Sequence, residues 1–512
     1  MKFNLKSRKE NALYSSVAGL TQQLLSIICA FIFRTFFLHV LSREYLGIEG
    51  LFSNLIQFFS LAELGIGTAI IYRMYKPFAD KDVDKIEAYL NFYKIAYHGI
   101  ALVVFILGVS IYPFLKYIIH MEEIPSNVDI TLVYFLFLIQ SVSSYLFIYK
   151  QSLYIANQQS YIIAIYNTLI NVISTIVKIL ILYITFDYVF TLTSSILITL
   201  IFNFLFNMYI DRYFSLANRY KNKLSRAEIK SIVNDTFGLL CHNIGSVVVN
   251  GTDNIVLSAF ISLSAVGMYD NYTIIVRGIF GIINKALQSF IPSIGNLNCK
   301  SDKSKVYDVY LRVLFVNLWI SSFSTICLYC LLNRFIYIWL DSTYIFNKEI
   351  VMSICILFYI QASRLTSNSF ISGCGLFMKD KIRPLIESLL NIIISIWLAN
   401  QIGIAGVIIG TIVSGVVTYY WREPYLLIKE IFGYLDSRFW TMEVIWPIMT
   451  IVLSFAFSNI IAVIPLDLYG FILSTIIVFI GSNIFLILLW NRSKEYKYFL
   501  YLLKDKIIKK YN

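Results

Sequence analysis

Long apolar runs alternate with short polar segments from one end of the chain to the other. A helix needs about 20 apolar residues to cross the hydrocarbon core of a bilayer, and nearly every run reaches that length. The runs are continuous, whereas the strands of a membrane β-barrel alternate in polarity. We therefore predict an all-α polytopic membrane protein with about 14 transmembrane helices. The predicted spans are 12–38, 46–72, 92–118, 131–153, 161–184, 190–210, 236–260, 265–293, 308–332, 350–374, 384–401, 404–427, 443–463 and 470–490.

The span 265–293 differs from an ordinary lipid-facing helix because it carries three charged residues, Asp270, Arg277 and Lys285. In a helix these three charges share one face, and isoleucines occupy the other. A cation at the centre of a bilayer costs roughly 3 kcal/mol on an insertion scale. We therefore expect the polar face to line a cavity. The alternative is that the cations reach the membrane surface or pair with acids on a neighbouring helix.

Polar stripes of the same kind occur on other spans, in both halves of the chain. Together they place five cations well inside predicted spans: Arg34, Lys178, Arg277, Lys285 and Arg364. We predict that these cations line one central, hydrated cavity and bind an anionic substrate, since arginine and lysine suit phosphate oxygens. Four acids on the same faces either bind a coupling ion, H⁺ or Na⁺, or pair with the cations: Glu63, Asp253, Asp270 and Glu387.

The distribution of basic residues predicts the orientation in the membrane. If the N-terminus lies inside, the inside segments carry 30 Lys and Arg and the outside segments carry 4. By the positive-inside rule both termini are then cytoplasmic. The same rule accounts for the net charge of +12, which on a soluble protein would suggest a nucleic-acid partner. In a chain with 58% hydrophobic and 14% charged residues, we predict membrane lipids as the surroundings and no nucleic acid.

A weak internal repeat suggests how the spans are grouped. A shift of 220 residues places Gly47 on Gly267 and Asn171 on Asn391, and it keeps the spans in phase. Two six-helix bundles would then run in the same direction around the central cavity. The predicted parts are an N-terminal lobe at 1–210, a cytoplasmic interfacial linker at 211–235, a C-terminal lobe at 236–427, and two extra helices with a basic tail at 428–512.

Several kinds of chemistry find no support in the chain. There is no GxxxxGK[ST] pattern for ATP binding, so we expect no ATP hydrolysis by this chain and no cofactor. The four histidines show no ligand spacing. Cys327 and Cys330 form a CxxC pattern, but they sit in an apolar run, which favours packed thiols over a metal site.

The opening run VAGLTQQLLSIICAFIFRTFFLHVLSREYLGIEGLFSNLIQFFSLAELGIGTAII, the fourteen spans and the basic mid-chain linker resemble the Wzx-type polysaccharide flippases. These belong to the multidrug/oligosaccharidyl-lipid/polysaccharide exporter superfamily. The resemblance implies a flippase that carries undecaprenyl-diphosphate-linked oligosaccharide units across the bacterial cytoplasmic membrane by alternating access. It implies polysaccharide polymerases and glycosyltransferases as partners. It also places Arg34 and Arg277 where related lipid II flippases have cavity arginines.

Two other functions stay open at this point. A multidrug efflux antiporter of the same superfamily would share the fold, but it handles cations and should have an acidic cavity. A membrane polymerase or glycosyltransferase would need a carboxylate-rich outside loop. The sequence IWLDSTY contains one candidate acid, Asp341, for which a capping or turn role is the simpler explanation.

Overall fold

The structure is a computed structural model of the whole chain. It describes residues 8–59, 66–117, 119, 124–125, 128–215, 222–232, 251–300, 302–434 and 436–501. Within these residues the regular structure is entirely helical, which confirms the predicted fold class. Eleven helical segments of the described residues are long and apolar enough to cross a membrane.

The predicted number of fourteen spans stays a prediction, because three of the predicted spans are not among these eleven. The span 46–72 falls on two helices, and 60–65 lies outside the described residues. Most of 236–260 also lies outside them, although 251–260 is helical. The third, α10 (Leu263–Gln288), is long enough but carries the polar stripe.

The chain folds into two compact units, which we describe separately. The first unit contains residues 1–274 and 380–403, and the second contains 275–379 and 404–512. Helix α10 contributes to both, with the division after Ile274. The predicted domain boundaries, with a linker at 211–235, stay a prediction.

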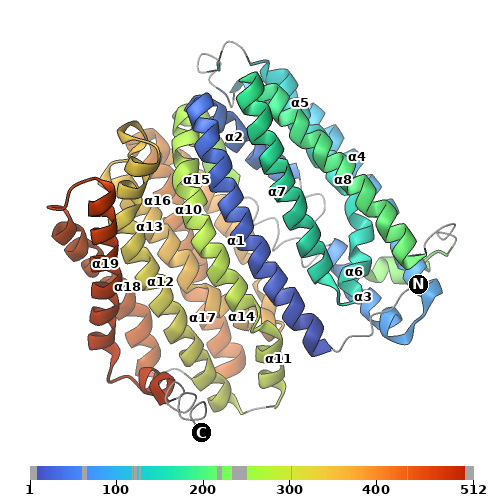
Figure 1. Cartoon of the computed structure of the whole chain (residues 1–512). Coiled ribbons are helices and arrows are strands. Elements are labelled where there is room, and N and C mark those ends of the chain that lie inside the picture. Colours follow the sequence, from blue (N-terminus) through green and yellow to red (C-terminus); the bar gives the residue numbers. More distant parts are fainter. Residues whose placement is uncertain are drawn as a thin grey trace, which may run out of the picture. The chain divides into compact units, whose positions relative to one another are not determined.

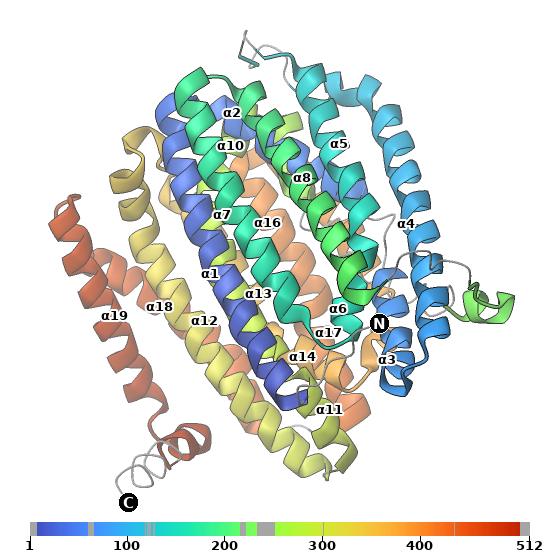
Figure 2. The same cartoon turned by 45° about the vertical axis from the view of Figure 1, so that its right-hand side comes forward.

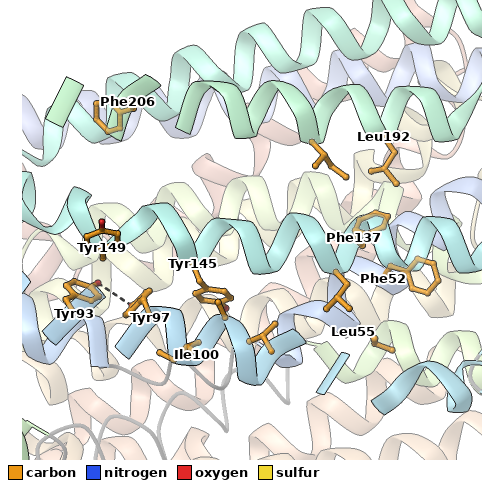
Figure 3. Packing of buried hydrophobic residues seen from close by; sticks show 14 of the residues in the cluster. Phe52, Leu55, Tyr93, Tyr97, Ile100, Phe137, Tyr145, Tyr149, Leu192 and Phe206 are labelled. Atoms are coloured by element: carbon orange, nitrogen blue, oxygen red, sulfur yellow. Dashed lines mark hydrogen bonds between the residues drawn. The ribbon is translucent and has the colours of Figure 1, made fainter. Parts of the chain in front are cut away.

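The first unit is built mainly from the N-terminal helices (Figure 1). They are α1 (Arg8–Val40), α2 (Arg43–Phe59), α3 (Ile66–Asp80), α4 (Val83–Ile111), α5 (Ile130–Ile148), α6 (Ser152–Ala156), α7 (Ser160–Thr185), α8 (Tyr188–Phe214) and α15 (Arg383–Ile402). Aromatic and aliphatic side chains from α2, α4, α5 and α8 form its core, which Figure 3 shows from close by. The Tyr93 hydroxyl donates to that of Tyr97 within this core, at 3.3 Å.

Helices α1 and α7 lie side by side in Figures 1 and 2, and they run parallel. Three contacts join them at a constant separation of 145 residues. The pairs are Ser15 with Ser160, Ser26 with Asn171, and Phe33 with Lys178. The steps along each helix are therefore 11 and 7 residues, which keep the contacts on one helical face. Parallel first and fifth spans agree with the predicted alternation of the loops.

The described part of the predicted linker packs on the first unit. We call residues 222–232 the linker segment. Its Asn222 amide donates to the Asp84 carboxylate at 3.1 Å, and its Glu228 carboxylate lies 3.3 Å from the Lys85 ammonium. The Arg73 guanidinium donates to the Ser231 hydroxyl at 2.7 Å. These contacts tie the linker segment to α3 and to the first turn of α4.

The second unit is built around α12 (Lys303–Trp339), which has 37 residues. It also holds α11 (Ile291–Lys300), α13 (Lys348–Ser363), α14 (Leu365–Gly373), α16 (Ile404–Gly415), α17 (Trp421–Leu427), α18 (Ser437–Ile461) and α19 (Leu468–Trp490). Two π-helical turns, Val416–Tyr420 and Ile428–Phe432, flank α17. Helices α13, α18 and α19 all pack on α12, and Figure 2 shows α18 and α19 beside it.

Aspartates in the short polar segments begin many of these helices. Asp82, Asp129, Asp187, Asp436 and Asp467 are N-caps whose carboxylates accept backbone N–H groups of the first turn. Such a cap satisfies donors that the helix itself leaves unpaired. Asp341 caps a short 3₁₀ turn by accepting from the Thr343 backbone N–H and hydroxyl, both at 2.6 Å, in agreement with its predicted role.

Helices α12 and α18 extend beyond the spans predicted for them. The predicted spans leave Arg334 between 308–332 and 350–374, but α12 continues to Trp339. The Arg334 side chain is buried, and its guanidinium donates to the backbone carbonyls of Ile461, Ile464 and Pro465 at the end of α18. The pattern of apolar residues did not predict where α12 ends, because the charged Arg334 within it has its hydrogen-bond partners at the end of another helix. Helix α18 starts at Ser437, six residues before the predicted span 443–463.

Candidate functional site

Arg34 is the first predicted site residue, and the structure places it against α10. Its Nη1 donates to the side-chain oxygen of Asn271 at 3.3 Å. Asn271 is completely buried, and its amide nitrogen has no hydrogen-bond partner among the described residues. Asp270, the preceding residue, accepts from the Asn254 amide at 3.1 Å. The first unit thus contains a polar cluster that joins α1, α10 and the helical residues 251–260.

Glycines bring α2 and the first turns of α10 unusually close together at this cluster. A Cβ atom on Gly47 would lie 2.2 Å from the carbonyl oxygen of Leu263, and one on Gly267 would lie 2.3 Å from that of Arg43. At Gly50 the added atom would meet the Asp270 carboxylate at 2.1 Å. Distances of this size to backbone atoms leave no room for a side chain. The two glycines that the 220-residue shift pairs in sequence therefore face each other.

Lys178 and Arg34 lie on the neighbouring helices α7 and α1. The Lys178 ammonium sits 4.9 Å from the centre of the Phe33 ring, in a cation–π contact. Phe33 directly precedes Arg34. Neither cation forms an ion pair with an acid in the described part of the chain. Two of the five predicted cations therefore lie on neighbouring helices of the first unit, and each contacts a neutral group.

The predicted acids of the first unit have separate surroundings. Glu387 is buried and accepts from the Arg383 guanidinium at 2.6 Å, and the same guanidinium bonds the buried Asp380 at 2.6 Å. Glu387 therefore pairs with Arg383, which is not one of the five predicted cations, and its predicted role stays a prediction. Asp253 is buried on the helical residues 251–260, and Glu63 lies outside the described residues.

In the second unit Arg277 is exposed on α10, and it has no hydrogen bond or ion pair with the residues that the structure describes. Lys285 lies two turns further along the same helix and is half-buried. Neither of these two lies in the first unit with Arg34 and Lys178. The single cavity predicted for all five cations concerns both units together, and it stays a prediction.

Arg364 has a strong partner within the second unit. Its Nε and Nη2 lie 2.9 and 2.7 Å from Oε1 of Glu423, which is buried in α17. Its guanidinium also stacks 3.9 Å from the centre of the Tyr419 ring. Sequence reasoning missed Glu423, although an acid inside the predicted span 404–427 was a usable signal.

Glu443 is a second acid that sequence reasoning missed, because it was placed at the edge of its span. It lies in the second turn of α18 and lines a small cavity together with Arg364 and Glu423. The Tyr420 hydroxyl is directed at it, 3.5 Å from its backbone oxygen. No cluster of three or more histidine, cysteine or acidic side chains that could hold a metal occurs among the described residues.

The sequence model of the family described as Polysaccharide biosynthesis protein matches residues 9–298. A search of curated proteins finds no match.

Several solved structures share the fold at low sequence identity. The structure titled lipid II flippase MurJ, inward closed conformation, has a TM-score of 0.68 at 15% identity, and the match covers 94% of this chain and 99% of that one. An inward-facing multidrug resistance MATE family transporter of the MOP superfamily has a TM-score of 0.59 at 14% identity, over 81% and 99%. A MOP superfamily transporter from Pyrococcus furiosus has a TM-score of 0.51 at 12% identity, over 84% and 99%. These neighbours are transporters and flippases rather than enzymes.

Proposed function

Since the chain belongs to the polysaccharide biosynthesis protein family and has the fold of the MOP superfamily, we propose that it flips undecaprenyl-diphosphate-linked oligosaccharide units across the bacterial cytoplasmic membrane. Family and fold support a membrane flippase of this superfamily. The lipid-linked saccharide is the finer part of the proposal. In this proposal the units serve surface polysaccharide synthesis, with glycosyltransferases supplying them and a polymerase consuming them.

One observation carries the choice of an anionic substrate. Arg34, Lys178 and Arg277 sit on predicted or observed membrane helices, yet none of them pairs with an acid among the described residues. Unpaired cations at membrane depth are costly, so they indicate a ligand or a hydrated space that compensates the charge. A diphosphate offers several oxygens to such a set, and arginine can bind two of them at once. Lys285 and Arg364 complete the proposed substrate-binding residues.

The mechanism that we propose is alternating access around a central cavity, with both termini in the cytoplasm. Saccharide hydroxyls would be held by the asparagine and serine side chains on the same helical faces as the cations. An ion gradient, H⁺ or Na⁺, would drive transport. Glu63, Asp253 and Asp270 are the coupling candidates, whereas Glu387 is engaged by Arg383.

Complementation tests the proposal. The chain is expressed in a bacterium whose own repeat-unit flippase is deleted, and surface polymer is scored beside lipid-linked intermediates. We compare wild type with Arg277→Ala and Arg277→Lys, and with Arg226→Ala as a matched control on the exposed face of the linker segment. Wild type and the control should restore polymer, Arg277→Ala should trap intermediates inside, and Arg277→Lys should restore part of the activity.

Two results would count against the proposal. Full activity of Arg277→Ala would show that this cation does not serve the substrate. Resistance to cationic drugs without any effect on polymer or intermediates would favour the efflux antiporter, whose fold this chain shares.

A further inference from the structure

A small polar cavity lies inside the second unit, between α14, α17, α18 and the π-helical turn Val416–Tyr420. Its volume is about 10 Å³, which holds a single water molecule. Three charged side chains line it: Arg364, Glu423 and Glu443. Ser363, Ser367 and Tyr420 supply hydroxyl groups to the same wall.

The charges of this cavity do not balance. Arg364 is bonded to Glu423 at 2.7 Å, so its charge is already matched. Within the described residues no basic side chain forms an ion pair with Glu443, whose neighbour is the neutral hydroxyl of Tyr420. Among the described residues, tyrosines also lie near this cluster: Tyr310 on α12, Tyr359 on α13 and Tyr419 beside Arg364. One negative charge is therefore in excess.

The position of Glu443 makes an uncompensated charge expensive. It lies six residues into α18, or roughly 9 Å along the axis of a helix that is long and apolar enough to cross a membrane. On its other side it lines a second, apolar groove of about 390 Å³ between α13 and α18, whose wall includes Val444, Ile448 and Ile451. A carboxylate between such a groove and a cavity of one water is poorly hydrated, and a bound cation would stabilise it.

The cavity favours a proton over a metal ion. A hard cation needs about six oxygen ligands at once, and the space admits a single water. The hydroxyls of Ser363 and Ser367 form hydrogen bonds within the protein, to the Ile360 carbonyl and to the Tyr310 hydroxyl. The Arg364 guanidinium lines the same cavity and would repel a metal ion. A protonated carboxyl group is neutral, so the guanidinium does not repel it.

We infer that Glu443 is a proton-binding site of the second unit, built by Tyr420 and the Arg364–Glu423 pair. The bound proton neutralises the carboxylate while the cavity is closed, and opening to water releases it. Proton binding itself does not depend on what the protein carries. Its use as the coupling site for transport rests on the proposed flippase function.

Infrared difference spectroscopy on the purified full-length protein tests the site directly. A pH step on wild type should change the carbonyl-stretch band of a protonated carboxyl group. Glu443→Gln should lose this band, whereas Glu443→Asp, which keeps the carboxyl group, should retain one. The matched control is Glu349→Gln, an exposed acid in the first turn of α13, which should behave as wild type.

The possible results distinguish proton binding by Glu443 from the proposed transport function. A wild-type protein without the band, a band that persists in Glu443→Gln, or ²²Na⁺ binding that Glu443→Gln abolishes would overturn the proton site. None of these results bears on complementation by wild type. If Glu443→Gln loses the band but flips substrate with an unchanged response to a pH gradient, the proton site stands and its coupling role falls.

Discussion

The contact between Arg364 and Glu423 predicts a large coupling energy between two residues 59 positions apart. The perturbations are Arg364→Met, which keeps the length of the side chain without its charge, Glu423→Gln, and the double variant. In the single variants one buried charge loses its partner. In the double variant neither member of the pair is charged, and the two neutral side chains fill nearly the same volume.

The magnitude follows from the geometry. Two guanidinium nitrogens lie within 2.9 Å of one carboxylate oxygen, and Glu423 is 1% exposed. Breaking such a buried pair from one side costs about 3–5 kcal/mol, whereas removing both charges is often neutral. Losing the Tyr419 stacking adds about 1 kcal/mol to each variant that lacks Arg364. We therefore expect Glu423→Gln to lose about 4 kcal/mol, Arg364→Met about 5 kcal/mol and the double variant about 1 kcal/mol, with a coupling energy of several kcal/mol.

The assay is equilibrium unfolding of the four proteins in mixed micelles, followed by tryptophan fluorescence, with complementation measured on the same variants. A double variant that loses the sum of the two single losses would refute the paired arrangement. Arg364 would be assigned to the substrate if Arg364→Met folds as wild type, traps lipid-linked intermediates and is not rescued by Glu423→Gln.

Three further predictions concern the helix contacts. Gly47→Ala should lower stability by about 1–3 kcal/mol, because its Cβ would meet a backbone oxygen at 2.2 Å, whereas Gly19→Ala, with open space around it, should not; thermal unfolding compares the two. Arg334→Met should cost about 3 kcal/mol and increase hydrogen exchange at the end of α18, whose carbonyls it leaves unpaired; unchanged exchange would contradict the capping role. Hydrogen bonds from the Ser225 backbone N–H and hydroxyl lower the pKa of Glu228, so this group stabilises the linker segment above its unfolded pKa of about 4.3 and loses the effect as the pH falls through the folded pKa. Hydrogen exchange of the segment should therefore rise on acidification in wild type and show a weaker dependence in Glu228→Gln.

The sequence alone determined the architecture and much of the local structure. Apolar runs of membrane length predict helices because lipid offers no partner for an open backbone, and this holds whatever the helices pack against. The aspartates before the runs act as caps through their nearest neighbours in the chain. Helical periodicity also identified the face of α10 that carries Asp270, and the alternation of loops agrees with the parallel course of α1 and α7.

The tertiary structure decided which partner each charge has. Periodicity places Arg364 and Glu423 on faces of their own helices, but it does not say that these faces meet. The same holds for Arg334, whose guanidinium binds backbone carbonyls at the end of α18. It holds also for Glu443, which lies in the second turn of α18 rather than at the start of the predicted span. Glu387, by contrast, pairs within one helix, at the four-residue step to Arg383, where the spacing itself could have shown it. Contacts between helices join side chains that are distant in sequence. The pattern of polar residues along one helix does not identify which residues of another helix lie beside it.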